Sequence, residues 1–177
     1  GDLASAFNEM TAGIQARERE IEQERTMLRT LVDTIPDLIW LKDQHGAYLG
    51  CNSRFESLYG ANEAEIIGKT DYEFVPTELA DFFREHDRKA MEKGGPSKNE
   101  EELTFADGHQ ELVETTKTPM HNERGELIGV LGIGHDITER KKDEARLQLA
   151  ASVFENAREG IMITSPTGEI VDVNNSF

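Results

Sequence analysis

The sequence starts to repeat itself 122 positions along the chain, and this repeat limits the fold more than any other feature. Residues 31–55 align without a gap with residues 153–177, so that Ile39 corresponds to Ile161 and Asn52 to Asn174. Both segments have the pattern of a helix end, a strand, a turn and a second strand. A period of this length indicates a tandem array of whole domains. Because the second copy stops after its first hairpin and the chain opens with Gly-Asp, we expect it to be part of a longer protein.

The composition excludes several classes of function. A net charge of −16 on 177 residues argues against nucleic acid or an anionic membrane surface as a partner, because both are polyanions. The single cysteine, Cys51, excludes an internal disulfide and a cysteine-rich metal site. The sequence contains no apolar run of about 18 residues, the length that a membrane-spanning helix needs.

Residues 1–30 have the heptad pattern of a helix that pairs with another helix. Apolar residues recur every seven positions, and a second series lies three positions further on, where Arg17 and Glu24 interrupt it. This pattern predicts a weak parallel two-stranded coiled coil, and therefore a homodimer. A single amphipathic helix that packs on its own domain is the alternative. The expected dimer contacts are Phe7, Met10, Ile14, Ile21, Leu28, Leu31 and Ile35.

From Asp37 onward the pattern changes to short strands and helices. An apolar run, a polar turn and a second run predict a hairpin; three helical segments follow, and then three strands in a meander. The fold class is therefore α+β: a five-stranded antiparallel sheet with a helical crossover, flanked by a long N-terminal coiled-coil helix and a C-terminal helix. The expected strands are Leu38–Leu41, Ala47–Cys51, Glu100–Phe105, Gln110–Met120 and Leu127–Asp136, and the expected helices are Ser53–Tyr59, Asn62–Ile67, Thr77–Lys93 and Glu139–Phe154.

The stretch from about Leu31 to Arg140 resembles a PAS domain of the type with a C-terminal PAC motif, common in bacterial sensor proteins. The matching segments are IPDLIWLKDQHGAYLGCNSRFESLYG, EIIGKTDYEFVP, EELTFADG and KTPMHNERGELIGVLGIGHDITERK. The resemblance implies the boundaries: a signalling helix at 1–30, a PAS domain at 31–140, a linker helix at 141–156 and the start of a second PAS domain at 157–177. The first 20 residues also resemble the second helix of a HAMP linker, which implies a transmembrane sensor upstream and a cytoplasmic location beside the inner membrane.

The Asp-Ile-Thr segment at the end of the last strand is the expected signal relay. Asp136 precedes a polar helical run, with Glu139 three residues on, which is an acidic form of the capping box. A strand end fixed to a helix start can convert a strand shift into helix movement. An ordinary helix cap without a signalling role is the alternative. The relay residues are Asp136, Ile137, Thr138 and Glu139.

In PAS domains small molecules bind between the inner face of the sheet and the helical crossover. The alternation of residues places one set of side chains on this side, although the same residues could simply pack the core. An inward-facing threonine of the strand at 110–120, or Glu114, could orient a polar ligand. The candidate pocket residues are Ile39, Leu41, Asn52, Phe55, Tyr59, Phe74, Phe82, Leu131 and Ile133.

The sequence predicts no cofactor and no metal. Flavin photosensors of this superfamily carry their reactive cysteine on a crossover helix, whereas Cys51 ends a strand. Haem-binding members use a histidine near the end of the crossover helix, and His86 lies about two turns before that end. The other histidines, His45, His109, His121 and His135, are too dispersed for a metal site.

We expect a non-enzymatic module of a signalling protein. Consecutive strand residues face opposite sides, so Glu100, Glu101 and Glu102 cannot act as a catalytic pair, and no nucleophile, P-loop or kinase motif is present. The resemblance implies an output domain outside this chain: a diguanylate cyclase, a cyclic di-GMP phosphodiesterase or a histidine kinase. A dimerisation scaffold without ligand and a small-molecule chemosensor are the alternatives.

Overall fold

The computed structural model describes residues 2–177, which cluster into two compact units, residues 2–135 and residues 136–177. The first unit contains the helix α1 (Asp2–Thr34) and the hairpin of β1 (Leu38–Asp43) and β2 (Tyr48–Cys51). It also contains the meander of β3 (Ser97–Thr104), β4 (Gln110–His121) and β5 (Leu127–Asp136). Asp136, the last residue of β5, is the first residue of the second unit. Between the hairpin and the meander lie α2 (Ser53–Tyr59), α3 (Glu63–Ile66), the short 3₁₀ helix η1 (Asp71–Glu73) and α4 (Thr77–Lys93). Each unit is described by itself.

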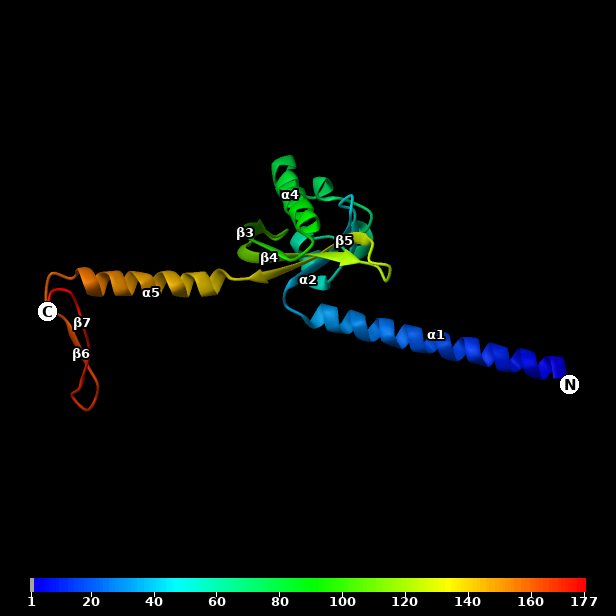
Figure 1. Cartoon of the computed structure of the whole chain (residues 1–177), viewed down its shortest axis with the longest axis horizontal. Helices are drawn as coiled ribbons and strands as arrows, with labels where there is room; N and C mark the ends of the chain where they lie inside the picture. The colour runs from blue at the N-terminus through cyan, green and yellow to red at the C-terminus, as the bar shows by residue number, and fades with distance from the viewer. Residues whose placement is uncertain (1) are drawn as a thin grey trace. The chain divides into compact units, whose positions relative to one another are not determined.

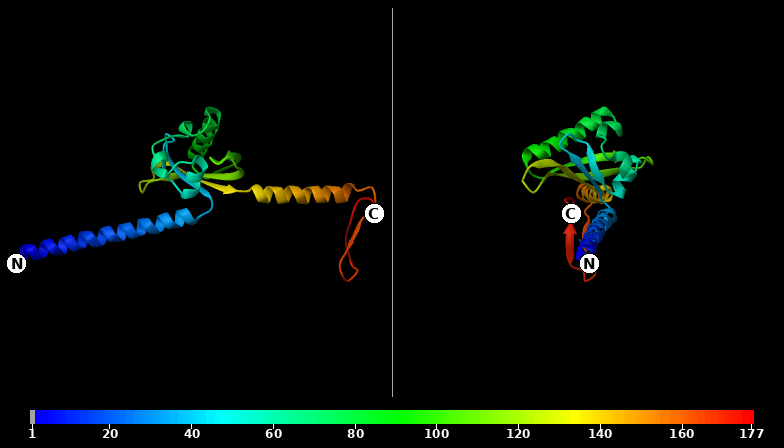
Figure 2. Two further views of the ribbon diagram at one scale, coloured as in Figure 1. Left: turned by 180° about the vertical axis from the view of Figure 1, so that it is seen from behind. Right: turned by 90° about the vertical axis from the view of Figure 1, so that its right-hand side faces the viewer.

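The five strands form one antiparallel sheet in the order β2-β1-β5-β4-β3. Figure 1 labels three of them, β3, β4 and β5. The hairpin and the meander therefore meet at β1 and β5, where Leu38 pairs with Gly134 and Asp43 with Gly129. The helix α4 lies over one face of the sheet in every view (Figure 2). The predicted α+β fold, with its five antiparallel strands, helical crossover and long N-terminal helix, is confirmed.

The element boundaries follow from local chemistry. Asn62 caps α3 through a complete capping box with Glu65, which satisfies two free amide groups at the helix start. The helix α4 ends at Gly94, which has a φ of 67°, a left-handed conformation that favours glycine.

In β5, Gly132 lies opposite Trp40, and a Cβ atom at this position would collide with the indole ring. The absent side chain lets Trp40 lie flat across the inner face of the sheet.

The core lies between the inner face of the sheet and the helical crossover. The side chains of Leu38, Trp40 and Lys42 point into it from β1, and all three are buried. The prediction that Ile39 and Leu41 face the interior was therefore wrong by one residue. The prediction failed because the residues on both faces of this strand are apolar up to Lys42, and a lysine was not expected to point inward.

The helix α1 is longer than predicted and ends at Thr34. Ile35 therefore lies beyond the helix, which corrects its place in the heptad series. The other six heptad residues are on α1, and each exposes more than half of its surface in the single chain. Pairing of two such helices stays a prediction.

The second unit consists of Asp136, α5 (Thr138–Asn156) and the hairpin β6 (Met162–Thr164) and β7 (Ile170–Val173). The helix α5 begins three residues before the predicted linker helix at 141. Met162 pairs with Val173, and most apolar side chains of this hairpin are exposed. No helix within residues 2–177 is both long and apolar enough to span a bilayer.

Candidate functional site

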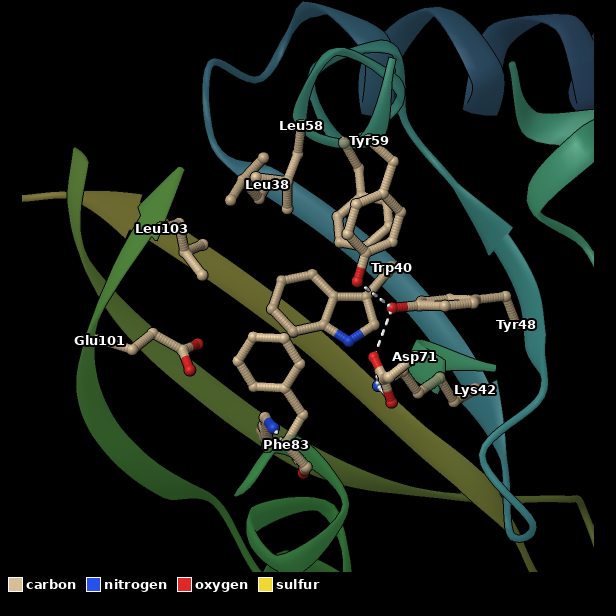
Figure 3. Close-up of a pocket in the computed structure, with 12 residues that line it drawn as sticks. Leu38, Trp40, Lys42, Tyr48, Leu58, Tyr59, Asp71, Phe83, Glu101 and Leu103 are labelled. Atoms are coloured by element: carbon tan, nitrogen blue, oxygen red, sulfur yellow. Dashed lines mark hydrogen bonds and ion pairs between the residues drawn. The ribbon is translucent and has the colours of Figure 1, made fainter. Parts of the chain in front are cut away.

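A small cavity of about 20 Å³ lies in the core of the first unit, between the sheet and the crossover. Its wall combines aromatic rings with charged side chains (Figure 3). The strands β1 and β2 contribute Trp40, Lys42 and Tyr48, and β3 and β4 contribute Glu101 and Lys117. A volume of this size has room for about one water-sized group. The remaining lining residues are Leu38, Phe55, Leu58, Tyr59, Asp71, Phe83 and Leu103.

Four buried charges beside the cavity form one ion-pair cluster. The Lys42 ammonium group lies 2.7 Å from Asp71 Oδ2 and 3.1 Å from Asp87 Oδ2. The Lys117 ammonium group lies 2.9 Å from Asp87 Oδ1 and donates a hydrogen bond to the carbonyl oxygen of Phe83, 3.1 Å away. These side chains come from two strands, η1 and α4, so the cluster ties the crossover to the sheet. Sequence reasoning missed this cluster. The available signal was Lys42, a lysine that directly follows four apolar residues of the same strand.

The environment of the cluster shifts several pKa values. Burial by itself raises the pKa of Asp87, but the adjacent Lys42 and Lys117 outweigh it, so the pKa is lowered from its ordinary value of 3.8. Burial raises the pKa of Tyr48 well above its ordinary value, and nearby Tyr59 and Asp71 add to the effect. The Tyr48 hydroxyl donates to Asp71 Oδ1 at 2.7 Å and lies 2.8 Å from the Tyr59 hydroxyl. Tyr48 therefore stays a neutral hydrogen-bond donor.

Two polar atoms that line the cavity have no hydrogen-bond partner among the described residues: Trp40 Nε1 and Glu101 Oε2. Both residues are more than nine-tenths buried, with exposed fractions of 5% and 9%. The other oxygen of Glu101 accepts a hydrogen bond from the hydroxyl of Thr115, the inward-facing threonine of β4. Figure 3 shows the Glu101 carboxylate extending from β3 toward the aromatic rings.

Of the predicted pocket residues, only Phe55 and Tyr59 line this cavity. Phe74 stacks on Tyr59 with ring centroids 4.4 Å apart and lines an adjoining cleft. Phe82 is 39% exposed and lies against His86, whereas its neighbour Phe83 points into the cavity. The candidate Glu114 instead lies near Lys98, with Nζ and Oε1 3.4 Å apart.

The remaining aliphatic candidates lie on the opposite face of the sheet, which corrects their assignment. Ile39, Leu41 and Leu131 line a groove of about 830 Å³ together with Leu28 and Val32 of α1. Ile133, which pairs with Ile39, is 36% exposed. This groove is also lined by Glu63 and Ile67 of the α3 segment, so these side chains belong to the connection between α1 and the sheet.

Asn52 joins the end of α1 to the sheet. It is fully buried, but its side chain takes part in this joint rather than in the cavity. Its Oδ1 accepts hydrogen bonds from the amide groups of Ile39 (3.1 Å) and Phe55 (3.0 Å), and its Nδ2 donates to the carbonyl oxygens of Val32 (3.2 Å) and Asp37 (2.9 Å). One side chain thus connects α1, β1 and α2.

Three charged residues extend this joint. Arg29 on α1 donates to Glu63 Oε2 at 2.7 Å and to the carbonyl oxygen of Cys51 at 3.0 Å. Asp33, one turn later, accepts from the amide of Ser53 at 2.9 Å. Because each contact reaches from the last turns of α1 to the β2–α2–α3 region, the orientation of this helix end is fixed by hydrogen bonds as well as by packing. We define the side chains of Arg29, Asp33, Asn52 and Glu63 as the input joint.

The second unit repeats the central part of this joint. Asn174 Oδ1 accepts from the amide of Ile161 at 2.8 Å, and Nδ2 donates to the carbonyl oxygens of Phe154 (3.0 Å) and Glu159 (2.9 Å). Phe154, Glu159 and Ile161 occupy the positions of Val32, Asp37 and Ile39 in the repeat. The same asparagine therefore attaches a preceding helix to a first strand in both copies.

At the other end of the domain, β5 leads into α5 through Asp136 and Ile137. Asp136 Oδ1 accepts from the amide of Thr138 at 2.8 Å. Ile137 is the N-cap residue of α5 and makes no side-chain cap hydrogen bond, and the Glu139 carboxylate accepts a hydrogen bond from Lys142 at 2.8 Å. Ile137 is almost fully buried, with an exposed fraction of 1%. Asp136 thus binds the amide of the first residue of α5.

His135, the residue before Asp136, connects this strand end to the start of β1. Its Nδ1 lies 2.7 Å from Asp37 Oδ1, and the backbone oxygen of Asp37 is held by Asn52. A short chain of contacts therefore leads from the input joint to the end of β5.

The candidates for haem and flavin attachment lie outside the cavity wall. His86 Nδ1 lies 2.8 Å from the carbonyl oxygen of Phe82 on its own helix. Cys51 is buried, and burial raises the pKa of its thiol to about 12, which disfavours the reactive thiolate. Residues 2–177 contain no cluster of three or more His, Cys, Asp or Glu side chains that could hold a metal ion.

Comparison with known proteins identifies the family. Residues 32–142 match the PAS fold, and residues 146–177 match a PAS domain. The aerobic respiration control sensor protein ArcB of Escherichia coli is 30% identical over 130 residues, or 73% of this chain and 17% of ArcB. The methanogenesis regulatory histidine kinase FilI of Methanothrix harundinacea is 29% identical over 140 residues, or 79% of this chain and 16% of FilI.

Solved structures agree with this result. The complex of VqmA from Vibrio cholerae with its ligand and DNA superposes with a TM-score of 0.59 at 28% identity, covering 64% of this chain and 51% of VqmA. The chain spans about a sixth of the length of ArcB and FilI. With the five-stranded sheet and its helical crossover, these matches show that the chain belongs to the PAS fold family.

Proposed function

We propose that this chain is a sensory and signal-relay module of a bacterial signal-transduction protein. The observation that carries the proposal is the joint at Asn52, because it attaches an incoming helix to the same strand, β1, that pairs with the outgoing strand β5. A movement of α1 would act on β1 through this joint, and from there on β5 and the Asp136 turn. The repeated joint at Asn174 supports serial transmission from one copy to the next.

The remaining parts of the proposal concern partners. The exposed heptad residues of α1 support a homodimer through this helix, since each of these apolar side chains has more than half of its surface exposed in the single chain. The HAMP-like first residues support a transmembrane sensor upstream and a cytoplasmic location at the inner membrane. The output domain we propose is a histidine kinase, as in FilI, with a diguanylate cyclase or a cyclic di-GMP phosphodiesterase as the other classes.

The test is the substitution Asp136→Ala in the protein that carries the output domain. It removes the acceptor of the Thr138 amide in the turn before α5, so we expect output activity to lose its response to stimulus while the melting temperature changes little. Asp143→Ala is the matched control, because Asp143 is exposed on α5 and lies 3.3 Å from the exposed Arg146. Unchanged regulation in Asp136→Ala would remove the relay role.

A further inference from the structure

We propose that His109 forms a proton-sensitive latch between the β3–β4 turn and the helix α2. The protonated imidazole would hold Asp107 and Glu111 together and keep the turn docked on the helix, and loss of the proton would release this contact. The proposal rests on the sensory function above for its purpose, because it names the proton as a stimulus that the module would detect.

The first argument is the geometry around the imidazole ring. His109 Nδ1 lies 2.5 Å from Asp107 Oδ1, and its Nε2 lies 3.0 Å from Glu111 Oε1. A neutral imidazole has one N–H group and can donate to only one of these carboxylates, so its other nitrogen would turn a lone pair toward the second carboxylate. The imidazolium form donates from both nitrogens. The observed arrangement therefore fits the protonated ring.

The second argument is the balance of charge at this ring. The charged groups around it come from the turn (Asp107), from β4 (Glu111) and from α2 (Arg54). Arg54 forms an ion pair with the same oxygen of Glu111, Oε1, that faces His109. With His109 protonated, two cations face two carboxylates and the cluster is neutral. Without that proton the cluster keeps one uncompensated negative charge.

The third argument is the pH range in which the ring changes charge. Hydrogen bonds with Asp107 and then Glu111 raise the pKa of His109 above its ordinary value of 6.5. The backbone amide and the ring of His109 in turn lower the pKa of Asp107 from its ordinary value of 3.8, so this carboxylate is charged at neutral pH. Because the folded-state pKa of His109 is raised, its stabilising contribution is fully present below pH 6.5 and is lost as the pH rises through the folded-state value. The latch is therefore closed on the acid side and opens on the alkaline side.

The fourth argument is that the turn is docked on the end of α2. The amide of Ala106 donates a hydrogen bond to the carbonyl oxygen of Leu58 at 3.0 Å. Gly60, which follows the helix, makes room for this approach, because a Cβ atom there would lie 2.7 Å from the Cβ atom of Ala106. The ring of His109 stacks on the buried ring of Phe105, with centroids 4.2 Å apart. The latch thus contacts the turn, the helix and the core.

The helix α2 also connects this latch to the input joint. Its N-cap residue, Asn52, accepts a hydrogen bond from the amide of Phe55 at the start of the helix, and the turn holds the other end at Leu58. Opening of the latch would release the second end while the first stays attached. The proton on His109 would therefore set how firmly α2 is held between the input joint and the turn.

The first measurement is an NMR titration of the whole 177-residue chain from pH 5 to pH 9, with the five imidazole signals assigned by His→Gln substitutions. We expect His109 to titrate above pH 6.5. Glu111→Gln should move this titration toward 6.5, because the amide still accepts a hydrogen bond but carries no charge. Glu114→Gln is the matched control, since Glu114 is a half-buried residue of the same strand and its ion pair is with Lys98.

The second measurement is hydrogen exchange of the Ala106 amide, expressed as a protection factor so that the intrinsic pH dependence of exchange cancels. We expect the protection to fall between pH 6 and pH 8.5 in the wild type, and this fall to be lost in His109→Gln. His121→Gln is the matched control, because His121 is an exposed histidine at the other end of β4. Circular dichroism confirms that the variants are folded.

Three results would overturn the proposal: titration of His109 at or below pH 6.5, Ala106 protection that does not change with pH in the wild type, or a fall that persists in His109→Gln. Both measurements are made on the chain itself and neither measures output. Failure of the latch is therefore distinguishable from failure of the relay, which the Asp136→Ala test measures separately.

Discussion

At the scale of single residues, this domain depends on polar side chains that are buried and paired. Asp87 has no exposed surface and contacts two lysines, and Asn52 is equally buried and makes four hydrogen bonds. Such groups stabilise a fold only while every partner is present, because removing one leaves a buried charge or donor uncompensated. The strongest effects of single substitutions are therefore expected at these positions.

Asp87 gives the stability a defined pH dependence. Because Lys42 and Lys117 lower its pKa in the folded state, its contribution is fully present above the ordinary value of 3.8 and is lost as the pH falls below it. Asp87→Asn should lower the free energy of unfolding at neutral pH by about 3 kcal/mol, since it leaves two buried lysines undercompensated. Urea unfolding at a series of pH values should show this difference shrinking below about pH 4.

Asp81→Asn is the control for this prediction, because Asp81 is exposed on the same helix and accepts a hydrogen bond from Tyr72. A difference between wild type and Asp87→Asn that stays constant down to low pH would mean that the ion-pair cluster does not govern the acid sensitivity.

At the scale of elements, local signals located the helices and strands well. Thr77–Lys93 and Leu127–Asp136 have the predicted bounds, because Gly94 ends the helix and Asp136 closes an apolar strand. Which side chains of β1 point into the core could not be predicted in the same way. Ile39 and Trp40 are both apolar, and the alternation along a strand does not say which of them points inward. The ion-pair cluster was missed because charged residues are normally expected at the surface.

The packing of β5 against β1 depends on Gly132. A Cβ atom at this position would collide with the indole of Trp40, so Gly132→Ala should displace the ring and destabilise the domain by about 1–3 kcal/mol. Because Trp40 is the only tryptophan, its emission spectrum measures the displacement directly, and urea unfolding measures the loss of stability. Gly95→Ala is the control, since nothing lies within 4 Å of the added Cβ atom. Wild-type emission and stability in Gly132→Ala would contradict the close packing.

At the scale of the whole molecule, the central claim is that α1 is coupled to the start of α5 through the PAS sheet. The proposed coupling follows the contacts from Asn52 to Asp37 and from Asp37 to His135, and then the chain to Asp136. The sequence indicated the two ends of this path, because the heptad pattern and the Asp-Ile-Thr segment are both local. It did not indicate the middle, since Asp37 and His135 are 98 residues apart and only the sheet brings them together.

The measurement that tests this coupling most directly is hydrogen–deuterium exchange of the chain carrying Asn52→Asp. This substitution keeps the shape of the side chain but replaces the Nδ2 donor with a charged oxygen that faces the carbonyl groups of Val32 and Asp37. We predict that the amides of residues 137–141 at the start of α5 exchange about tenfold faster, equivalent to about 1.4 kcal/mol in opening free energy. The exposed control Asn8→Asp should leave them unchanged. Faster exchange confined to residues near the substitution, with α5 unaffected, would contradict the relay.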